Sequence, residues 1–222
     1  MINIVYLLGP KHSSKIVKKA AEYLRSESVI ALPTDTLYGL ACLAQHSPAI
    51  KKLYQIKARD EAKPVAICVS EVSEVSEWGQ VTVSDQLLGQ LLPGPVTLVF
   101  QRSPLLNPDL NPGNDLVGIR IPDSWFIRQL VDHLRQPLAL TSANLSGAQS
   151  TLAPEEFGDI WHQLKAVYHG GRIPDSPVAR LGSTVVDLSV PGKYKIIRPG
   201  CAHQQTVRTL EQHGLENVET NE

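Results

Sequence analysis

The stretch V-I-A-L-P-T-D-T-L-Y-G-L, residues 29–40, decides how the sequence is interpreted. Its first four residues are apolar and partly β-branched, so they predict a buried strand. Pro33 has a fixed φ and no N–H group, so we expect it to end the hydrogen-bond ladder. Thr34, Asp35 and Thr36 then place hydroxyls and a carboxylate at the end of a buried strand, where α/β folds bind ligands. The alternative is that Asp35 and Thr36 cap a short helix, and the stretch alone favours neither.

Composition narrows the class of protein. The chain has 222 residues, 42% of them hydrophobic, which is ample for one core. We expect one domain over residues 1–205 and a C-terminal helix and tail over 206–222. A net charge of −1 gives no electrostatic basis for tight, sequence-independent binding of nucleic acid.

The cysteines and the N-terminus bear on the compartment. Cys42, Cys68 and Cys201 are odd in number and widely spaced, which predicts free thiols in a reducing compartment. No apolar run has membrane-spanning length, and the N-terminus lacks the features of a signal or transit peptide. We therefore expect a cytoplasmic protein without membrane contact, and a mitochondrial pool is left open.

Apolar runs and helical periodicities alternate along the chain, which predicts an α/β fold. Strands are expected at residues 2–8, 29–32, 64–69, 96–100, 117–122, 137–140, 183–188 and 193–197. Helices are expected at residues 13–24, from 47 to about 57, and at 71–78, 84–92, 125–134, 154–165 and 206–215. A Gly/Pro/Ser-rich loop is expected at residues 168–181.

Three polar features stand beside these elements, each with a structural alternative. Lys57 and Arg59 follow a helix and suit a phosphate clamp, or they simply solvate the helix end. Arg120 lies in a short apolar strand, where it either faces solvent or meets an anion. The segment 141–147 repeats the pattern of strand, small polar residues and Gly, and it forms either a ligand loop or an ordinary turn. Two such strand ends favour one shared ligand cleft.

Common catalytic signatures are missing from the sequence. There is no phosphate-binding P-loop, no G-x-G-x-x-G and no G-x-S-x-G, and no His or Cys pair has zinc spacing. The residues alone therefore predict an α/β domain with a polar, Arg-bearing cleft for an anionic small molecule, and they name no reaction.

Eight short motifs carry the interpretation further. They are P-T-D-T-L-Y-G-L (33–40), K-A-R (57–59), K-P (63–64), L-P-G-P-V-T-L-V (92–99), G-I-R-I-P (118–122), T-S-A-N-L-S-G (141–147), S-T-V-V-D (183–187) and I-R-P-G (197–200). Together and in this order they resemble the YrdC/Sua5 family, and among its members the animal ones most of all. The resemblance covers residues 14–200. It implies a single domain with a twisted, mixed parallel and antiparallel sheet, flanked by helices around a concave groove.

The resemblance also implies an activity. Family members are L-threonylcarbamoyladenylate synthases, nucleotidyltransferases that join L-threonine, bicarbonate and ATP with Mg²⁺ and release pyrophosphate. Their product serves N6-threonylcarbamoyladenosine formation at position 37 of tRNAs that read ANN codons. A separate tRNA threonylcarbamoyl transferase complex performs that second step, so a functional link to it is expected, and weak tRNA binding is left open.

Residue roles follow from the family motifs position by position. The catalytic set is Lys57, Arg59, Ser142 and Asn144. ATP binding is expected at these four residues and at Lys63, Ser150 and Arg198. L-threonine binding is expected at Thr36, Arg120, Leu140 (through its backbone) and Ser183. Magnesium is expected to enter through ATP, with no ligand from the protein. One departure is Cys68, where some relatives have a His that contacts threonine.

Two other hypotheses remain at this stage. A non-catalytic module for double-stranded RNA or tRNA would use the same Lys and Arg side chains for nucleic-acid phosphates, and it would bind with a steep salt dependence. A carbamoyl-type transferase for a different amine is the second, since the sequence does not give the pocket size. We also expect Lys57→Ala or Arg59→Ala to abolish activity with the fold intact.

Overall fold

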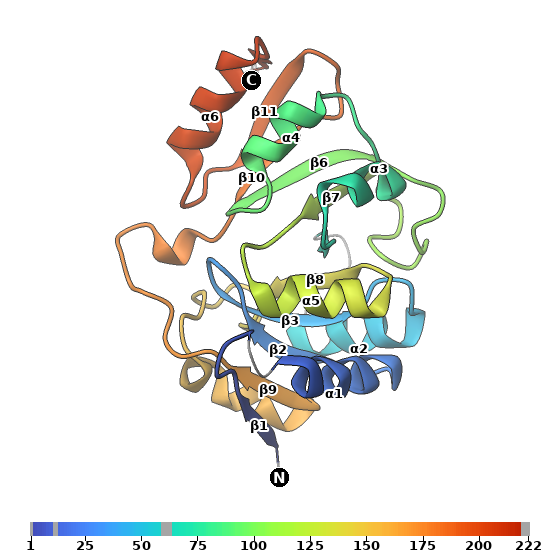
Figure 1. The fold of residues 1–222 in the computed structure, drawn as a ribbon, viewed down its shortest axis with the longest axis vertical. Coiled ribbons are helices and arrows are strands. Elements are labelled where there is room, and N and C mark those ends of the chain that lie inside the picture. The colour runs from blue at the N-terminus through green and yellow to red at the C-terminus, as the bar shows by residue number, and fades with distance from the viewer. Residues whose placement is uncertain (1, 11–12, 59–63, 219–222) are drawn as a thin grey trace.

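The sheet of the molecule is mixed and flanked by helices (Figure 1), as expected. The structure is a computed structural model that describes residues 2–10, 13–58 and 64–218. The described residues form 12 strands. Their order is β1 (Asn3–Tyr6), β9 (Ala166–His169), β2 (Ile30–Pro33), β3 (Tyr38–Leu43), β8 (Leu138–Ser142), β4 (Ala66–Cys68), β7 (Leu116–Arg120), β6 (Val96–Arg102), β10 (Thr184–Asp187), β11 (Lys193–Arg198) and β12 (Glu216–Asn217), and β5 (Gly79–Gln80) pairs with β6.

Both strand senses occur in the middle of this sheet. β3 pairs antiparallel with β2 and β8, and β8 pairs antiparallel with β4. β4 then pairs parallel with β7, and β6 pairs parallel with β10. As a result the β2–β3 turn, β4, β7, β8 and β10, which are far apart in sequence, are neighbours in space.

Helices cover both faces of the sheet (Figure 1). α1 (Ser13–Arg25) and α5 (Trp125–Leu134) lie side by side on one face, and α2 (Ser47–Lys57) lies on the other. The remaining helices are η2 (Val72–Glu74), α3 (Val75–Trp78), α4 (Asp85–Leu91), η3 (Pro154–Gln163), η4 (Ala179–Leu181) and α6 (His203–Gln212).

Side-chain alternation in β2 explains this layering. Ile30 and Leu32 join the core under α1 and α5, whereas Ala31 joins the core under α2. Successive residues of a strand point to opposite faces, so a strand buried on both faces appears as a continuous apolar run. That is why residues 29–32 show no polar alternation.

Strand pairing settles three points about local structure. Asp35 and Thr36 do not cap a helix, because β3 follows them and pairs antiparallel with β2. Pro33 is the last residue of β2 and pairs with Tyr38, so the strand ends there as expected, at a position that tolerates the missing N–H. The expected loop 168–181 begins inside β9, whose pairing with β1 and β2 depends on residues distant in sequence.

Two helices also differ from their expected form. Residues 154–163 form the 3-10 helix η3, which is kinked at Phe157 and ends two residues before the expected position. The C-terminal helix α6 begins at His203, three residues before the expected position, and its Leu210 is fully buried.

Candidate functional site

A cavity of about 370 Å³ lies among the β2–β3 turn, β4, β6, β7, β8, β10 and β11. Within the described part of its wall, the charged side chains are Arg120 and Arg198, and no acidic side chain takes part. Hydroxyl groups and glycines supply much of the rest. A partly enclosed, basic and hydroxyl-rich cavity favours an anionic ligand, as the sequence predicted.

The β2–β3 turn brings its polar side chains to this wall. Thr34 Oγ1 accepts hydrogen bonds from the backbone N–H groups of Thr36 (3.0 Å) and Leu37 (3.1 Å), and Thr34 N donates to Leu37 O (3.0 Å). The hydroxyl therefore shapes the turn. Thr34 and Thr36 both line the cavity.

Arg120, at the end of β7, is only 6% exposed and lies in the cavity wall. Its Nη2 donates to Thr36 Oγ1 (3.0 Å) and to the carboxylate of Asp35. Among the described residues, Arg120 Nε and Asp35 Oδ2 are buried without a hydrogen-bond partner. Buried polar groups are normally satisfied, so these two atoms are an exception within a cluster that lies at the cavity wall.

Ser183 and Arg198 form a second polar group in the wall. Ser183 Oγ lies 2.9 Å from Thr97 Oγ1, and Arg198 Nη2 donates to Ser183 O (2.9 Å) and to Ser183 Oγ (3.3 Å). Gly200, the last residue of the I-R-P-G motif, packs so tightly that a Cβ there would overlap the Ser183 backbone. The motif thus holds β11 against the residue before β10.

Lys57 ends α2 and is 2% exposed. Its ammonium donates to Ser142 O (2.7 Å), to Asn144 O and to Asn144 Oδ1 (3.2 Å). Lys57 of the K-A-R motif therefore contacts the T-S-A-N-L-S-G segment, whereas Arg59 of the same motif lies outside the described residues. Lys57 and Asn144 are nevertheless absent from the described cavity wall, so their contacts with a nucleotide stay predictions.

The other predicted residues fall into two groups. Ser142, Ser150 and Leu140 line the same cavity as Arg120, Ser183 and Arg198. Arg59 and Lys63 lie outside the described residues, so their predicted roles are untested.

Cys68 also lines the cavity, and burial raises the pKa of its thiol to about 12. Burial raises the pKa values of Cys42 and Cys201 as well, and Cys201 is the least enclosed of the three. The thiolate is the reactive form of cysteine. Cys68 is therefore expected to act in the wall as a small apolar group and not as a nucleophile.

A labelling experiment tests this description of the thiols. At pH 8, N-ethylmaleimide is expected to modify the native chain at Cys201 alone, because Cys42 and Cys68 are fully buried. All three cysteines of the sequence should react in urea. Intact-mass and peptide spectrometry count and locate the adducts, and rapid native labelling of Cys68 would contradict its burial.

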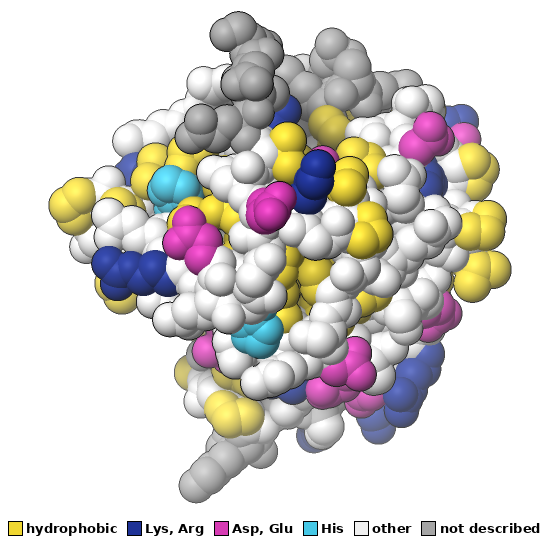
Figure 2. All heavy atoms as spheres, turned by 90° about the horizontal axis from the view of Figure 1, so that it is seen from above, with side chains coloured by type: hydrophobic (Ala, Val, Ile, Leu, Met, Phe, Trp, Pro, Cys, Tyr) yellow, Lys and Arg dark blue, Asp and Glu magenta, His cyan; other side chains and the backbone are white. Residues whose placement is uncertain are grey.

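Within residues 2–10, 13–58 and 64–218, no three His, Cys, Asp or Glu side chains gather to hold a metal ion. No helix of those segments is long and apolar enough to cross a membrane. Figure 2 shows one face of the molecule, where described Lys and Arg side chains are interspersed with Asp and Glu. That face offers no broad basic patch for nucleic acid.

The sequence analysis did not pair Asp35 with Arg120 and gave no role to Thr97, although both touch predicted site residues. For Asp35 a signal existed: a cation inside an apolar strand requires a counter-charge, and Asp35 is the only acidic residue of the stretch 29–40. For Thr97 there was no comparable signal, because a threonine in a strand has a good β propensity on its own.

Comparisons with known proteins give a consistent family. The family model Sua5_yciO_yrdC, described as telomere recombination, matches residues 22–200. The human protein named threonylcarbamoyl-AMP synthase is 55% identical over 205 residues, 91% of this chain and 74% of the human one. A protein of Methanocaldococcus jannaschii named putative threonylcarbamoyl-AMP synthase is 37% identical over 154 residues, 69% of this chain and 72% of its own.

Solved structures share the fold. Pyrococcus abyssi Sua5 complexed with L-threonine superposes with a TM-score of 0.82 at 24% identity, over 98% of this chain and 62% of that one. Escherichia coli YciO superposes with a TM-score of 0.78 at 24% identity, over 90% of this chain and 96% of its own. At such identities these likenesses establish the architecture of the chain and not its activity.

Proposed function

The chain belongs to the Sua5/YciO/YrdC family, and from this membership we infer that it is an enzyme that makes threonylcarbamoyl-AMP for N6-threonylcarbamoyladenosine synthesis. Four animal proteins with that enzyme name are 53–55% identical to this chain, and the match covers 73–74% of their own length. We propose further that it is a nucleotidyltransferase whose substrates are ATP, L-threonine and bicarbonate, and whose second product is pyrophosphate.

The buried guanidinium of Arg120 is the observation that carries the threonine assignment. It lies in the cavity wall, and its Nε has no described partner. A planar guanidinium can hold a carboxylate through two parallel hydrogen bonds. Thr36 and Ser183 supply hydroxyls in the same cavity, and Leu140 offers its backbone. We assign the amino-acid end of the cavity to these residues.

The nucleotide is assigned to the remaining residues of the predicted set. Ser142, Ser150 and Arg198 line the cavity, and Lys57 and Asn144 anchor the loop that carries Ser142. Arg59 and Lys63 are assigned from the family motifs alone. Cations and hydroxyls of this kind suit a triphosphate, because they bind its oxygens without acting as nucleophiles.

The proposed reaction needs no covalent intermediate on the protein. The threonine amine adds to bicarbonate and water leaves, which gives a carbamate. A carbamate oxygen then attacks the α-phosphorus of ATP, the bond to the β-phosphate oxygen breaks, and pyrophosphate leaves. The protein aligns the two reactants and stabilises charge on phosphoryl oxygens, two contributions that preorganised sites supply.

Magnesium is proposed to enter with ATP. The cavity wall offers hydroxyls and cations but no described carboxylate, a donor set that suits a metal held by phosphate oxygens and water. When bound, the ion would neutralise phosphate charge. The protein's part is then to hold the phosphates through Arg198 and the predicted cations.

Partners and compartment follow from the product. A mixed anhydride of a carbamate and AMP is short-lived in water, so we propose that it passes to a tRNA threonylcarbamoyl transferase complex. Weak binding of tRNA by this chain is left to experiment. The cytoplasm is the proposed compartment, in keeping with three free thiols.

One assay tests the assignment. The full chain with Mg²⁺, ATP, L-threonine and bicarbonate is expected to release pyrophosphate and to form threonylcarbamoyl-AMP, detected by mass. Omission of threonine or of bicarbonate, or chelation of Mg²⁺, should abolish both signals. L-serine and glycine serve as competing amines, because they lack one or more atoms of the threonine side chain.

Two results would contradict the proposal. Absence of the adenylate, together with salt-sensitive filter binding of tRNA and no nucleotide binding, would support an RNA-binding module. Faster turnover with another amine than with L-threonine would support a different carbamoyl-type transferase.

A further inference from the structure

The segment that links β9 to β10 crosses from one part of the sheet to another and ends in the cavity wall. We call residues 170–182 the strap. In the strand order β9 lies beside β1 and β2, whereas β10 lies beyond β6 (Figure 1). The strap contains only the short helix η4, and residues 174–178 are exposed. Leu181 and Gly182 at its end, and Ser183 directly after it, line the cavity.

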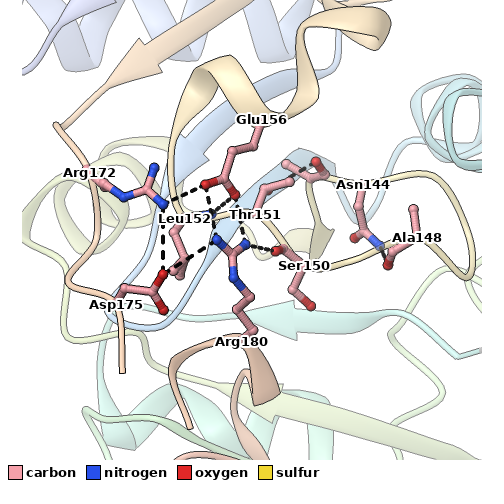
Figure 3. A network of polar contacts seen from close by, with 10 residues as sticks. Asn144, Ala148, Ser150, Thr151, Leu152, Glu156, Arg172, Asp175 and Arg180 are labelled. Atoms are coloured by element: carbon pink, nitrogen blue, oxygen red, sulfur yellow. Dashed lines mark hydrogen bonds and ion pairs between the residues drawn. The ribbon is translucent and has the colours of Figure 1, made fainter. Parts of the chain in front are cut away.

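The ion pair between Arg180 and Glu156 joins the strap to the Ser150 segment just before these wall residues. Arg180 Nη1 donates to Glu156 Oε2 (2.8 Å) and Arg180 Nη2 donates to Glu156 Oε1 (3.2 Å), a bidentate arrangement. The same Nη1 donates to Ser150 O (2.6 Å). Figure 3 shows Arg180 reaching between Glu156 and Ser150.

Glu156 also holds the opposite wall. Its Oε2 accepts from the backbone N–H of Leu152 (3.0 Å), which fixes the segment that carries Ser150. Its Oε1 lies 2.9 Å from Arg172 Nη2. The hydrogen bond from Arg180, assisted by the Leu152 N–H and both arginines, lowers the pKa of Glu156 to about 2. The carboxylate is therefore ionised at neutral pH.

We propose that Glu156 and Arg180 are positioning residues that couple the nucleotide and amino-acid ends of the cavity. The inference rests on the proposed function, because it uses the assignment of Ser150 to ATP and of Ser183 to threonine. The ion pair joins the segments of both residues next to the cavity, so a ligand that orders one wall also orders the other. Each ligand should then bind more tightly when the other is present.

Calorimetric titration of the full chain measures this coupling directly. The probe is α,β-methylene-ATP with Mg²⁺, titrated with and without saturating L-threonine, so that no chemistry follows binding. In the wild type, threonine is expected to tighten binding of the probe by ~5-fold or more, at the lower end of typical coupling between sites. In Glu156→Gln and in Arg180→Lys, the factor should fall below about twofold, by the same relation.

Asp175→Asn is the matched control. It removes the same unit of charge from the same network, since Asp175 lies 3.7 Å from Arg180 Nη2 and 3.9 Å from Arg172 Nη2. Its side chain is 55% exposed, and neither pair involves Ser150 or Leu152. We expect its coupling factor to equal that of the wild type.

The outcomes separate the two proposals. Binding of both ligands by the wild type without mutual enhancement would overturn the coupling and leave the proposed function standing. Full enhancement in Arg180→Lys or Glu156→Gln, or an equal loss in Asp175→Asn, would also overturn it. Failure of the wild type to bind either ligand would overturn the proposed function itself. Arg180→Lys keeps the charge balance, so a folding defect of Glu156→Gln does not block the test.

Discussion

Arg120→Leu is expected to lower kcat/KM for L-threonine by ~10³, because truncation of one member of a buried, hydrogen-bonded charge pair costs about 2–5 kcal/mol of binding. The substituted guanidinium is the buried cation of the cavity wall, with an Nε free of any described partner. The loss should appear mainly in the KM for threonine, and the KM for ATP should change by much less. Initial rates of pyrophosphate release at varied threonine and varied ATP measure the two separately.

The same substitution also removes the partner of Asp35, whose side chain is 12% exposed. Breaking a buried ion pair on one side typically costs about 3–5 kcal/mol of stability, because the remaining charge stays buried. The double variant Arg120→Leu/Asp35→Asn removes that charge. We expect it to regain much of the lost free energy of unfolding in urea, yet none of the threonine-dependent activity.

This pair of variants distinguishes binding from folding. If activity returned together with stability in the double variant, Arg120 would be a structural residue. A KM for threonine unchanged in Arg120→Leu would remove the anion-binding assignment altogether.

The central hairpin shows how far the sequence could predict the fold. The apolar run 29–32 identified a buried strand, because both of its faces pack against helices. Residues 34–37, which follow Pro33, could equally have begun a helix, since Thr and Asp favour both turns and helix N-termini. What decides for a hairpin is the pairing of β3 with β8, a strand almost 100 residues later.

The sequence predicted which residues lie near one another more completely than it predicted their contacts. Arg120, Ser142, Ser150, Ser183 and Arg198 do share one cavity, as the motif order implied. The Glu156–Arg180 pair was not foreseen, because both residues lie outside the family motifs and their meeting depends on the course of the strap. Glu and Arg are mostly found at protein surfaces, so neither residue stands out in the sequence.

The contacts of Lys57 in the structure differ from the role that the sequence predicted for it. The expectation was a phosphate contact whose loss leaves the fold intact. The ammonium is instead buried and donates to three described acceptors of the segment 142–144. A buried acceptor that loses its donor costs about 1–3 kcal/mol, so removal of this amine is expected to affect the fold as well as the activity.

Lys57→Met is therefore a more specific test than Lys57→Ala, because it keeps most of the aliphatic side chain and removes the ammonium. We expect the free energy of unfolding to fall by ~3 kcal/mol, because Asn144 O and Asn144 Oδ1 lose their donor, whereas Ser142 O keeps the backbone N–H of Asn144. Pyrophosphate release should fall by ~10²–10³, since a displaced Ser142 no longer meets the nucleotide. Urea unfolding and steady-state rates measure the two effects, and hydrogen exchange should quicken in residues 142–150.

Lys52→Met on the same helix is the control. Lys52 is 50% exposed and its amine lies 3.1 Å from Glu27 O and 3.7 Å from the Glu27 carboxylate, a surface contact worth about 0–1 kcal/mol. It should leave turnover and exchange unchanged. If Lys57→Met lost turnover with wild-type stability and exchange, the ammonium would act on the phosphates directly, because a group that only anchors a loop cannot be removed without loosening that loop.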